Sequence, residues 1–197
     1  QWATDEYIRR NRVSGASPWP LISPICPVVV RLIAFRFPGL LAHVLPVLRP
    51  VALMTREVQE QILPGYAETG RKVVLYYINP CPTLAVPPLD QLAAQPLRCS
   101  AAIGINEIYP ELKRRIETVL ASDRIPFSGT HFEFETCSTA NAALGAISGG
   151  EIANLDVERS LAVHGMEETI SYLHKIEMGL LKDVEYIEFR TCREGCI

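Results

Sequence analysis

Four of the six cysteines have surroundings that suit metal binding. Cys26 lies in "SPICPVVV" and Cys81 in "INPCPTL", each directly before a proline, and Cys192 and Cys196 lie four residues apart in "TCREGC". A cysteine that precedes a helix beginning with proline is close to free backbone N–H groups and to the positive end of the helix dipole, which favour the thiolate. Thiolate is the form that binds metals, and four thiolates suit a tetrahedral metal ion or a 4Fe–4S cluster.

The segments next to these cysteines place them at the ends of predicted elements. Cys81 follows "KVVLYYI", a uniformly apolar run typical of a central strand covered on both faces, and Cys192 follows a second expected strand, "VEYIEFR". Cys26 directly precedes a helix that is expected to begin at Pro27. Ligands of open α/β sheets gather beyond the carboxyl ends of the strands, so these positions suit one common site. If "CREGC" forms a helical turn, Cys196 shares a face with Cys192.

Strands that alternate with helices predict an α/β fold with parallel sheets, and the length allows one large domain or two small lobes. The loop-like "PPLDQLAAQPLRC" indicates a lobe boundary near 87–100, and residues 1–17 form an N-terminal helix or arm ahead of a domain over 18–197. Asn106 is expected to cap a helix that tolerates Pro110 only in its first turn. The other expected elements are helices over 27–38, 51–63, 106–121, 139–150 and 166–178, and strands over 72–78, 131–136, 160–165 and 184–190.

The composition of the 197-residue chain is that of an ordinary globular α/β protein, with 48% hydrophobic and 21% charged residues. A net charge of −3 gives no electrostatic reason to expect nucleic acid as a partner. No apolar run reaches the roughly 18 residues that a membrane span needs. We therefore expect a cytoplasmic protein without a membrane partner. The abrupt start at Gln1 suggests a fragment of a longer chain.

Spacing alone leaves other interpretations of the cysteines open. A cysteine that follows a strand is commonly a small buried hydrophobic residue, and we expect Cys99 and Cys137 to be structural. The absence of any Cys-x2-Cys pair excludes a zinc ribbon, and six cysteines are too few for a small secreted disulfide scaffold. The four histidines have no H-x3-H spacing, so we expect them to lie on the surface or in packing contacts.

The order of the motifs and their flanking residues resemble the C-terminal domain of the FeFe-hydrogenase large subunit. "ISPICPVVVRLI", "INPCPTL", "SGGE" and "HGMEETISYLHKIEMGLLKDVEYIEFRTCREGC" carry the resemblance, which runs from about Pro18 onward and is nearest to the divergent sensory or regulatory branch. The family fold has two α/β lobes, each with a small, mainly parallel sheet flanked by helices, so the resemblance implies the same for this chain. Between the lobes of that family lies an H-cluster, which consists of a 4Fe–4S cluster linked through one cysteine sulfur to a diiron unit. The resemblance implies that Cys26, Cys81 and Cys192 bind the 4Fe–4S cluster. It also implies that Cys196 is the fourth ligand and bridges to the diiron unit.

Departures from the family pattern affect the expected activity. The first family motif has two adjacent cysteines, of which the first relays protons, and Ile25 occupies that position here. Leu84 stands in place of a lysine that holds a cyanide ligand, which removes a charge-assisted hydrogen bond worth roughly 1.5–3 kcal/mol. The family's "CPGGC" is "CREGC" here, with Arg193 and Glu194 between the cysteines. The resemblance therefore implies cluster binding without fast hydrogen turnover.

Three functions remain as alternatives at this point. The first is a hydrogenase-like iron–sulfur domain, with or without the diiron unit, that acts in redox or gas sensing or in electron transfer. Because the chain has no C-x2-C-x2-C-x3-C run, its partners would be a ferredoxin-like electron-transfer domain or protein and a signalling domain. The second is an active FeFe-hydrogenase for H2 oxidation or proton reduction, in which Glu133, Glu135, Glu188 or Glu194 relays protons. The third is a metal-free scaffold domain whose terminal cysteine pair holds zinc or a disulfide.

Overall fold

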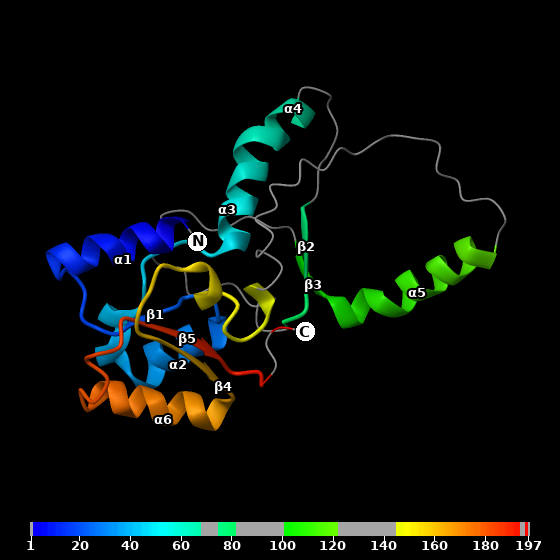
Figure 1. Ribbon diagram of the computed structural model, residues 1–197. Helices are drawn as coiled ribbons and strands as arrows, with labels where there is room; N and C mark the ends of the chain where they lie inside the picture. The colour runs from blue at the N-terminus through cyan, green and yellow to red at the C-terminus, as the bar shows by residue number, and fades with distance from the viewer. Residues whose placement is uncertain (1, 68–74, 82–100, 122–144, 194–195, 197) are drawn as a thin grey trace.

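The structure is a computed structural model that describes residues 2–67, 75–81, 101–121, 145–193 and 196. Its helices are α1 (Trp2–Ser14), α2 (Pro27–Arg36), α3 (Pro50–Glu57), α4 (Leu63–Ala67), α5 (Ile105–Ala121) and α6 (Met166–Glu177) (Figure 1). Its strands are β1 (Leu21–Ile22), β2 (Tyr76–Asn79), β3 (Ala101–Gly104), β4 (Ser160–His164) and β5 (Tyr186–Arg190). Short 3-10 helices cover Pro38–His43 and Ile152–Asn154, and a π-helical turn, Val58–Ile62, joins α3 to α4.

The strands form two small sheets. In the first, β5 lies between β1 and β4, and Tyr186 is in register with both Leu21 and Ser160. In the second, β2 pairs with β3 from Tyr76↔Ala101 to Asn79↔Gly104. Every strand pair in the described parts of the chain is parallel. The predicted α/β fold with small parallel sheets is therefore confirmed.

The central strand β5 is buried along its whole length, and its two faces differ in chemistry. Side chains alternate between the faces of a strand, so Ile187 and Phe189 share one face and Tyr186, Glu188 and Arg190 share the other. The Ile187 face joins the main hydrophobic core with α2 and α6. The residues that those helices contribute to this core are Val29, Ile33, Leu173 and Ile176. On the other face Tyr186 packs in a second cluster with Ile8 of α1, Leu21 and Leu45.

Several predicted elements are confirmed, and one helix begins differently from expectation. The helices predicted over 27–38, 51–63 and 166–178 and the strands over 160–165 and 184–190 are present. However, α5 begins at Ile105, so Gly104 rather than Asn106 is the residue before the helix. The Glu107 carboxylate accepts a hydrogen bond of 2.9 Å from the Gly104 N–H, which is half of a capping box. Pro110 consequently lies inside the helix and not in its first turn.

Other expectations are wrong. The strand at 72–78 was expected to be covered on both faces, but its described part, β2, has Tyr76 56% and Ile78 52% exposed. The reason is that β2 belongs to a two-stranded sheet in the described part of the chain. The described end of the helix predicted over 139–150 is a 3-10 and turn segment, and Gly149 within it takes a positive φ of 79°. The strand over 131–136 lies outside the described residues, and the domain boundaries remain predictions. Within the part that the structure describes, we find no helix with the length and apolar character of a membrane span.

Candidate metal centre

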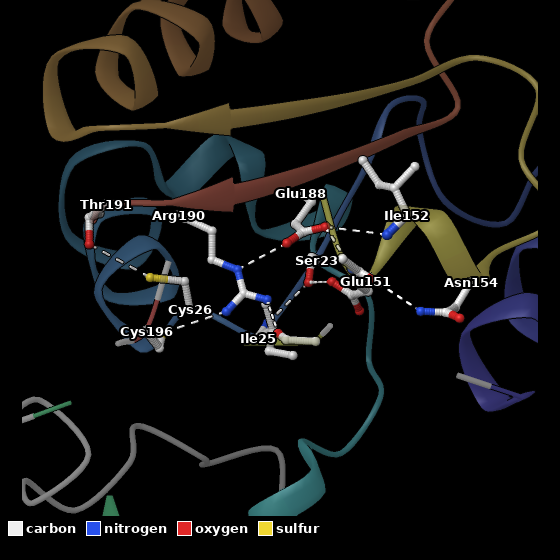
Figure 2. A network of polar contacts seen from close by, with 12 residues as sticks. Ser23, Ile25, Cys26, Glu151, Ile152, Asn154, Glu188, Arg190, Thr191 and Cys196 are labelled. Carbon is white, nitrogen blue, oxygen red and sulfur yellow. Dashed lines mark hydrogen bonds and ion pairs between the residues drawn. The ribbon is translucent and has the colours of Figure 1, made fainter. Parts of the chain in front are cut away.

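The end of β5 and the start of α2 bring two predicted ligand segments together. Cys26 is the residue before α2, its carbonyl accepts the first helical hydrogen bond from Val30, and Pro27 occupies the first helical position. The side chain of Cys26 is 5% exposed, and its Sγ lies 3.8 Å from Thr191 Oγ1, one residue beyond β5 (Figure 2). Since β1 and β5 are parallel, the segments that follow them leave the same edge of the sheet. The position predicted for Cys26 ahead of a helix is confirmed.

An arginine on β5 contacts the sulfur of the last cysteine. Figure 2 shows the Arg190 guanidinium between Glu188 and Cys196. Nε of Arg190 donates to Glu188 Oε1 at 3.0 Å, Nη1 donates to Cys196 Sγ at 3.5 Å, and Nη2 donates to the carbonyl of Gly145. The side chains of Arg190 and Glu188 are 3% and 0% exposed, so this ion pair is fully buried. Burial alone would lower the pKa of Arg190, but the hydrogen bond and charge of Glu188 raise it above its ordinary value.

The electrostatics of Cys196 connect it to two other predicted ligands. Burial raises the pKa of the Cys196 thiol, and the hydrogen bond and charge of Arg190 oppose this shift. The Cys26 and Cys81 sulfurs raise the same pKa further. The backbone N–H of Cys196 is held by a hydrogen bond of 2.8 Å to the carbonyl of Ala146.

The other two predicted ligands occupy different environments. Cys81 is half-buried and follows β2 by two residues, whereas Cys192 follows β5 by two residues and is exposed. The expected helical turn between Cys192 and Cys196 includes 194–195, which lie outside the described residues. The structure therefore places Cys26 in the interior, Cys81 and Cys196 in half-buried positions and Cys192 at the surface, and the convergence of the four sulfurs on one site stays a prediction.

The described residues do not form a site for a single metal ion. Among the residues that the structure describes, no three His, Cys, Asp or Glu side chains converge closely enough to hold one ion. A 4Fe–4S cluster binds each thiolate through a different iron, so its ligands are spaced more widely. Asn79, at the end of β2 and 1% exposed, has an amide nitrogen and oxygen without a hydrogen-bond partner in the described structure. A buried amide in this state indicates that a further polar group belongs nearby.

A second polar cluster adjoins the ion pair, and sequence reasoning missed it. The Ser23 hydroxyl donates to Glu151 Oε2 at 2.5 Å, and the Glu151 and Ile152 N–H groups donate to Glu188 Oε2 at 3.1 and 3.3 Å (Figure 2). Burial raises the pKa of Glu151, and its hydrogen bond from Ser23 opposes the shift. The signal that was available is the alternation in "EYIEFR", which places Glu188 and Arg190 on one face of the strand.

The residues named for proton transfer are only partly described. Ile25 is half-buried, and its N–H donates to the Ser23 hydroxyl at 3.2 Å. Glu188 is completely buried and paired with Arg190. The remaining candidates, Glu133, Glu135 and Glu194, lie outside the described residues, as does Leu84 at the predicted cyanide-anchoring position.

Comparison with solved structures identifies the fold. The FeFe-hydrogenase HydA1 from Chlamydomonas reinhardtii, in a glutamate-to-alanine variant, matches with a TM-score of 0.63 and 14% identity over 96% of this chain and 63% of its own. A glutamate-to-glutamine variant of the same enzyme matches with a TM-score of 0.59 and 14% identity over 98% and 63% of the two chains. A FeFe-hydrogenase studied for oxygen inactivation through its H-cluster 2Fe subcluster matches with a TM-score of 0.59 and 14% identity over 97% and 63%.

These similarities hold at the level of structure. The chain spans 63% of the length of each of the three hydrogenases. No protein-family model and no curated protein sequence matches it. At 14% identity the comparison establishes a shared fold and leaves the chemistry to be argued from the residues. The chain has a hydrogenase-like α/β fold.

Proposed function

We propose that this chain is a hydrogenase-like iron–sulfur domain that binds a 4Fe–4S cluster through Cys26, Cys81, Cys192 and Cys196. The observation that carries the proposal is the hydrogenase-like fold, on which Cys26 directly precedes α2, Cys81 follows β2 and Cys196 contacts Arg190 at the end of β5. Thiolates are the ligands that such clusters require, and a bound cluster supplies one-electron transfer. The exposed Cys192 completes the set as the ligand nearest to solvent.

The surroundings of the cysteines favour a sensing or electron-transfer role over hydrogen turnover. Ile25 directly precedes Cys26 and has no ionisable group, so it cannot pass a proton. Glu188 is fully buried and paired with Arg190, which leaves it no free carboxylate to shuttle protons. We propose that the chain belongs to the sensory or regulatory branch. A ferredoxin-like domain or protein would supply its electrons, and a signalling domain would receive its output.

The test is anaerobic reconstitution with iron and sulfide, followed by iron and acid-labile sulfide analysis and electron paramagnetic resonance of the reduced protein. We expect about four irons per chain, as a 4Fe–4S cluster requires. Cys26→Ser and Cys81→Ser should lose this iron, whereas Cys99→Ser and Cys137→Ser, which change cysteines outside the proposed ligand set, should keep it. A folded wild-type protein without iron would refute the proposal in favour of a metal-free scaffold. Incorporation of a diiron unit, followed by hydrogen uptake, would instead support an active hydrogenase.

A further inference from the structure

The guanidinium of Arg190 is fixed in position by three separate hydrogen bonds. Glu188 accepts from Nε at 3.0 Å, the carbonyl of Gly145 accepts from Nη2, and Cys196 Sγ accepts from Nη1 at 3.5 Å. The first two contacts use two corners of the planar fork and leave the third directed at the sulfur. With its side chain 3% exposed, Arg190 has little room for another orientation. The sulfur contact is therefore built into the fold.

A buried cation beside a cluster ligand has a definite electrostatic effect. Reduction adds one negative charge to a cluster and its thiolates, and both a positive charge and an N–H donor at a ligand sulfur stabilise the added charge. This effect is larger in a buried site than in water, because the effective dielectric constant is lower. Glu188 offsets part of the charge of Arg190 but does not contact the sulfur in the described structure.

We infer that Arg190 is a positioning residue that raises the reduction potential of the cluster through its hydrogen bond to the Cys196 sulfur. This inference rests on the proposed function, since it requires a cluster bound to Cys196. The simpler alternative is that Arg190 only neutralises the buried Glu188. The two roles differ in their consequences, because neutralisation affects stability alone, whereas the sulfur contact also affects the potential.

The experiment uses two variants of Arg190 and one matched control. Arg190→Lys keeps the positive charge near Glu188 but replaces the three-way fork with a single ammonium group. The double variant Arg190→Met with Glu188→Gln removes both charges, so neither partner is left as an unpaired ion and the protein should still fold. The control is Arg12→Lys, because Arg12 pairs with Glu185 at 3.0 Å before the start of β5, away from the cysteines.

Iron content and the reduction midpoint potential are measured on each reconstituted protein. We expect full iron in all variants, a more negative potential in Arg190→Lys, a still more negative one in the double variant, and no change in Arg12→Lys. Full iron with unshifted potentials in both Arg190 variants would overturn the inference and leave the proposed function intact. Loss of iron from both variants, with the fold retained, would overturn it in favour of a role in holding the cluster. No iron in the wild-type protein would refute the proposed function, and the inference with it.

Discussion

Replacing Arg190 with alanine should destabilise the fold strongly, even without any metal. The change removes the 3.0 Å ion pair to Glu188 and leaves that carboxylate 0% exposed, with hydrogen bonds only from the Glu151 and Ile152 N–H groups in the described structure. Breaking a buried pair by removing one partner costs about 3–5 kcal/mol, because a buried charge is left uncompensated. This is a large fraction of the roughly 5–15 kcal/mol that stabilises a typical domain.

The assay is urea unfolding of the metal-free protein, with the free energy of unfolding taken from the midpoint and slope. The matched control is the double variant Arg190→Met with Glu188→Gln, which removes both charges while keeping side-chain volume. Such replacements are often neutral, so we expect a loss below about 2 kcal/mol. If Arg190→Ala falls within about 1 kcal/mol of the wild type, the uncompensated-charge reasoning is refuted. The reasoning is also refuted if the double variant is as unstable as Arg190→Ala.

Three further changes test other parts of the structure. Burial raises the pKa of Glu151, so ionising this carboxyl group at neutral pH destabilises the folded protein. Glu151→Gln should therefore increase the free energy of unfolding at pH 7. Urea titrations should show that this gain disappears below the ordinary pKa of 4.5, where the carboxyl group is protonated in both the folded and the unfolded protein. Gly165→Ala puts an alanine before α6 at φ 89° and ψ 147°, a strained backbone conformation for any residue with a Cβ, and should lower the stability measured by thermal unfolding by about 1–3 kcal/mol. The control is Gly39→Ala, where the backbone has no positive φ and the change should be close to neutral. Arg12→Gln should cost below about 1 kcal/mol, because the pair with Glu185 is partly exposed. Arg12 lowers the pKa of Glu185, so this cost should be present at neutral pH and disappear in acid as the carboxylate is protonated.

The elements that the sequence predicts correctly are those whose signals are local. Helix α2 has a proline at its first position, α6 has an apolar stripe followed by a positive-φ glycine, and β5 carries the strand-forming residues Tyr186, Ile187 and Phe189. Strands β1 and β3 were missed for the opposite reason. Leu21–Ile22 is a strand only because it pairs with β5, where Leu21 is in register with Tyr186, more than 160 residues further along the chain. The short "AAIG" of β3 likewise has no strand signal apart from its pairing with β2.

In the candidate site, too, the residues with a local signal were predicted and the long-range contacts were not. The cysteines could be proposed as metal ligands from the sequence, because their residue type and their positions before a helix or after a strand can be read along the chain. The contact between Ser23 and Glu151 joins residues 128 positions apart, and nothing near either residue signals it. The alternation of β5 placed Glu188 and Arg190 on one face, but a polar face ordinarily indicates solvent. Here that face is buried, so its charges pair with one another and with the cysteine sulfur.

The burial of the Glu188–Arg190 pair is difficult to explain by stability. Hydrophobic residues of similar volume at both positions would be expected to give an equally stable or more stable fold. The pair instead fixes a guanidinium at the end of β5, where one N–H reaches Cys196. If Arg190 acts on the cluster, the double variant should change the reduction potential much more than the stability. It should unfold close to the wild-type denaturant concentration and hold its cluster at a more negative potential. A purely structural pair predicts an unchanged potential, whatever happens to the stability. Measuring both quantities on that one variant decides between the two.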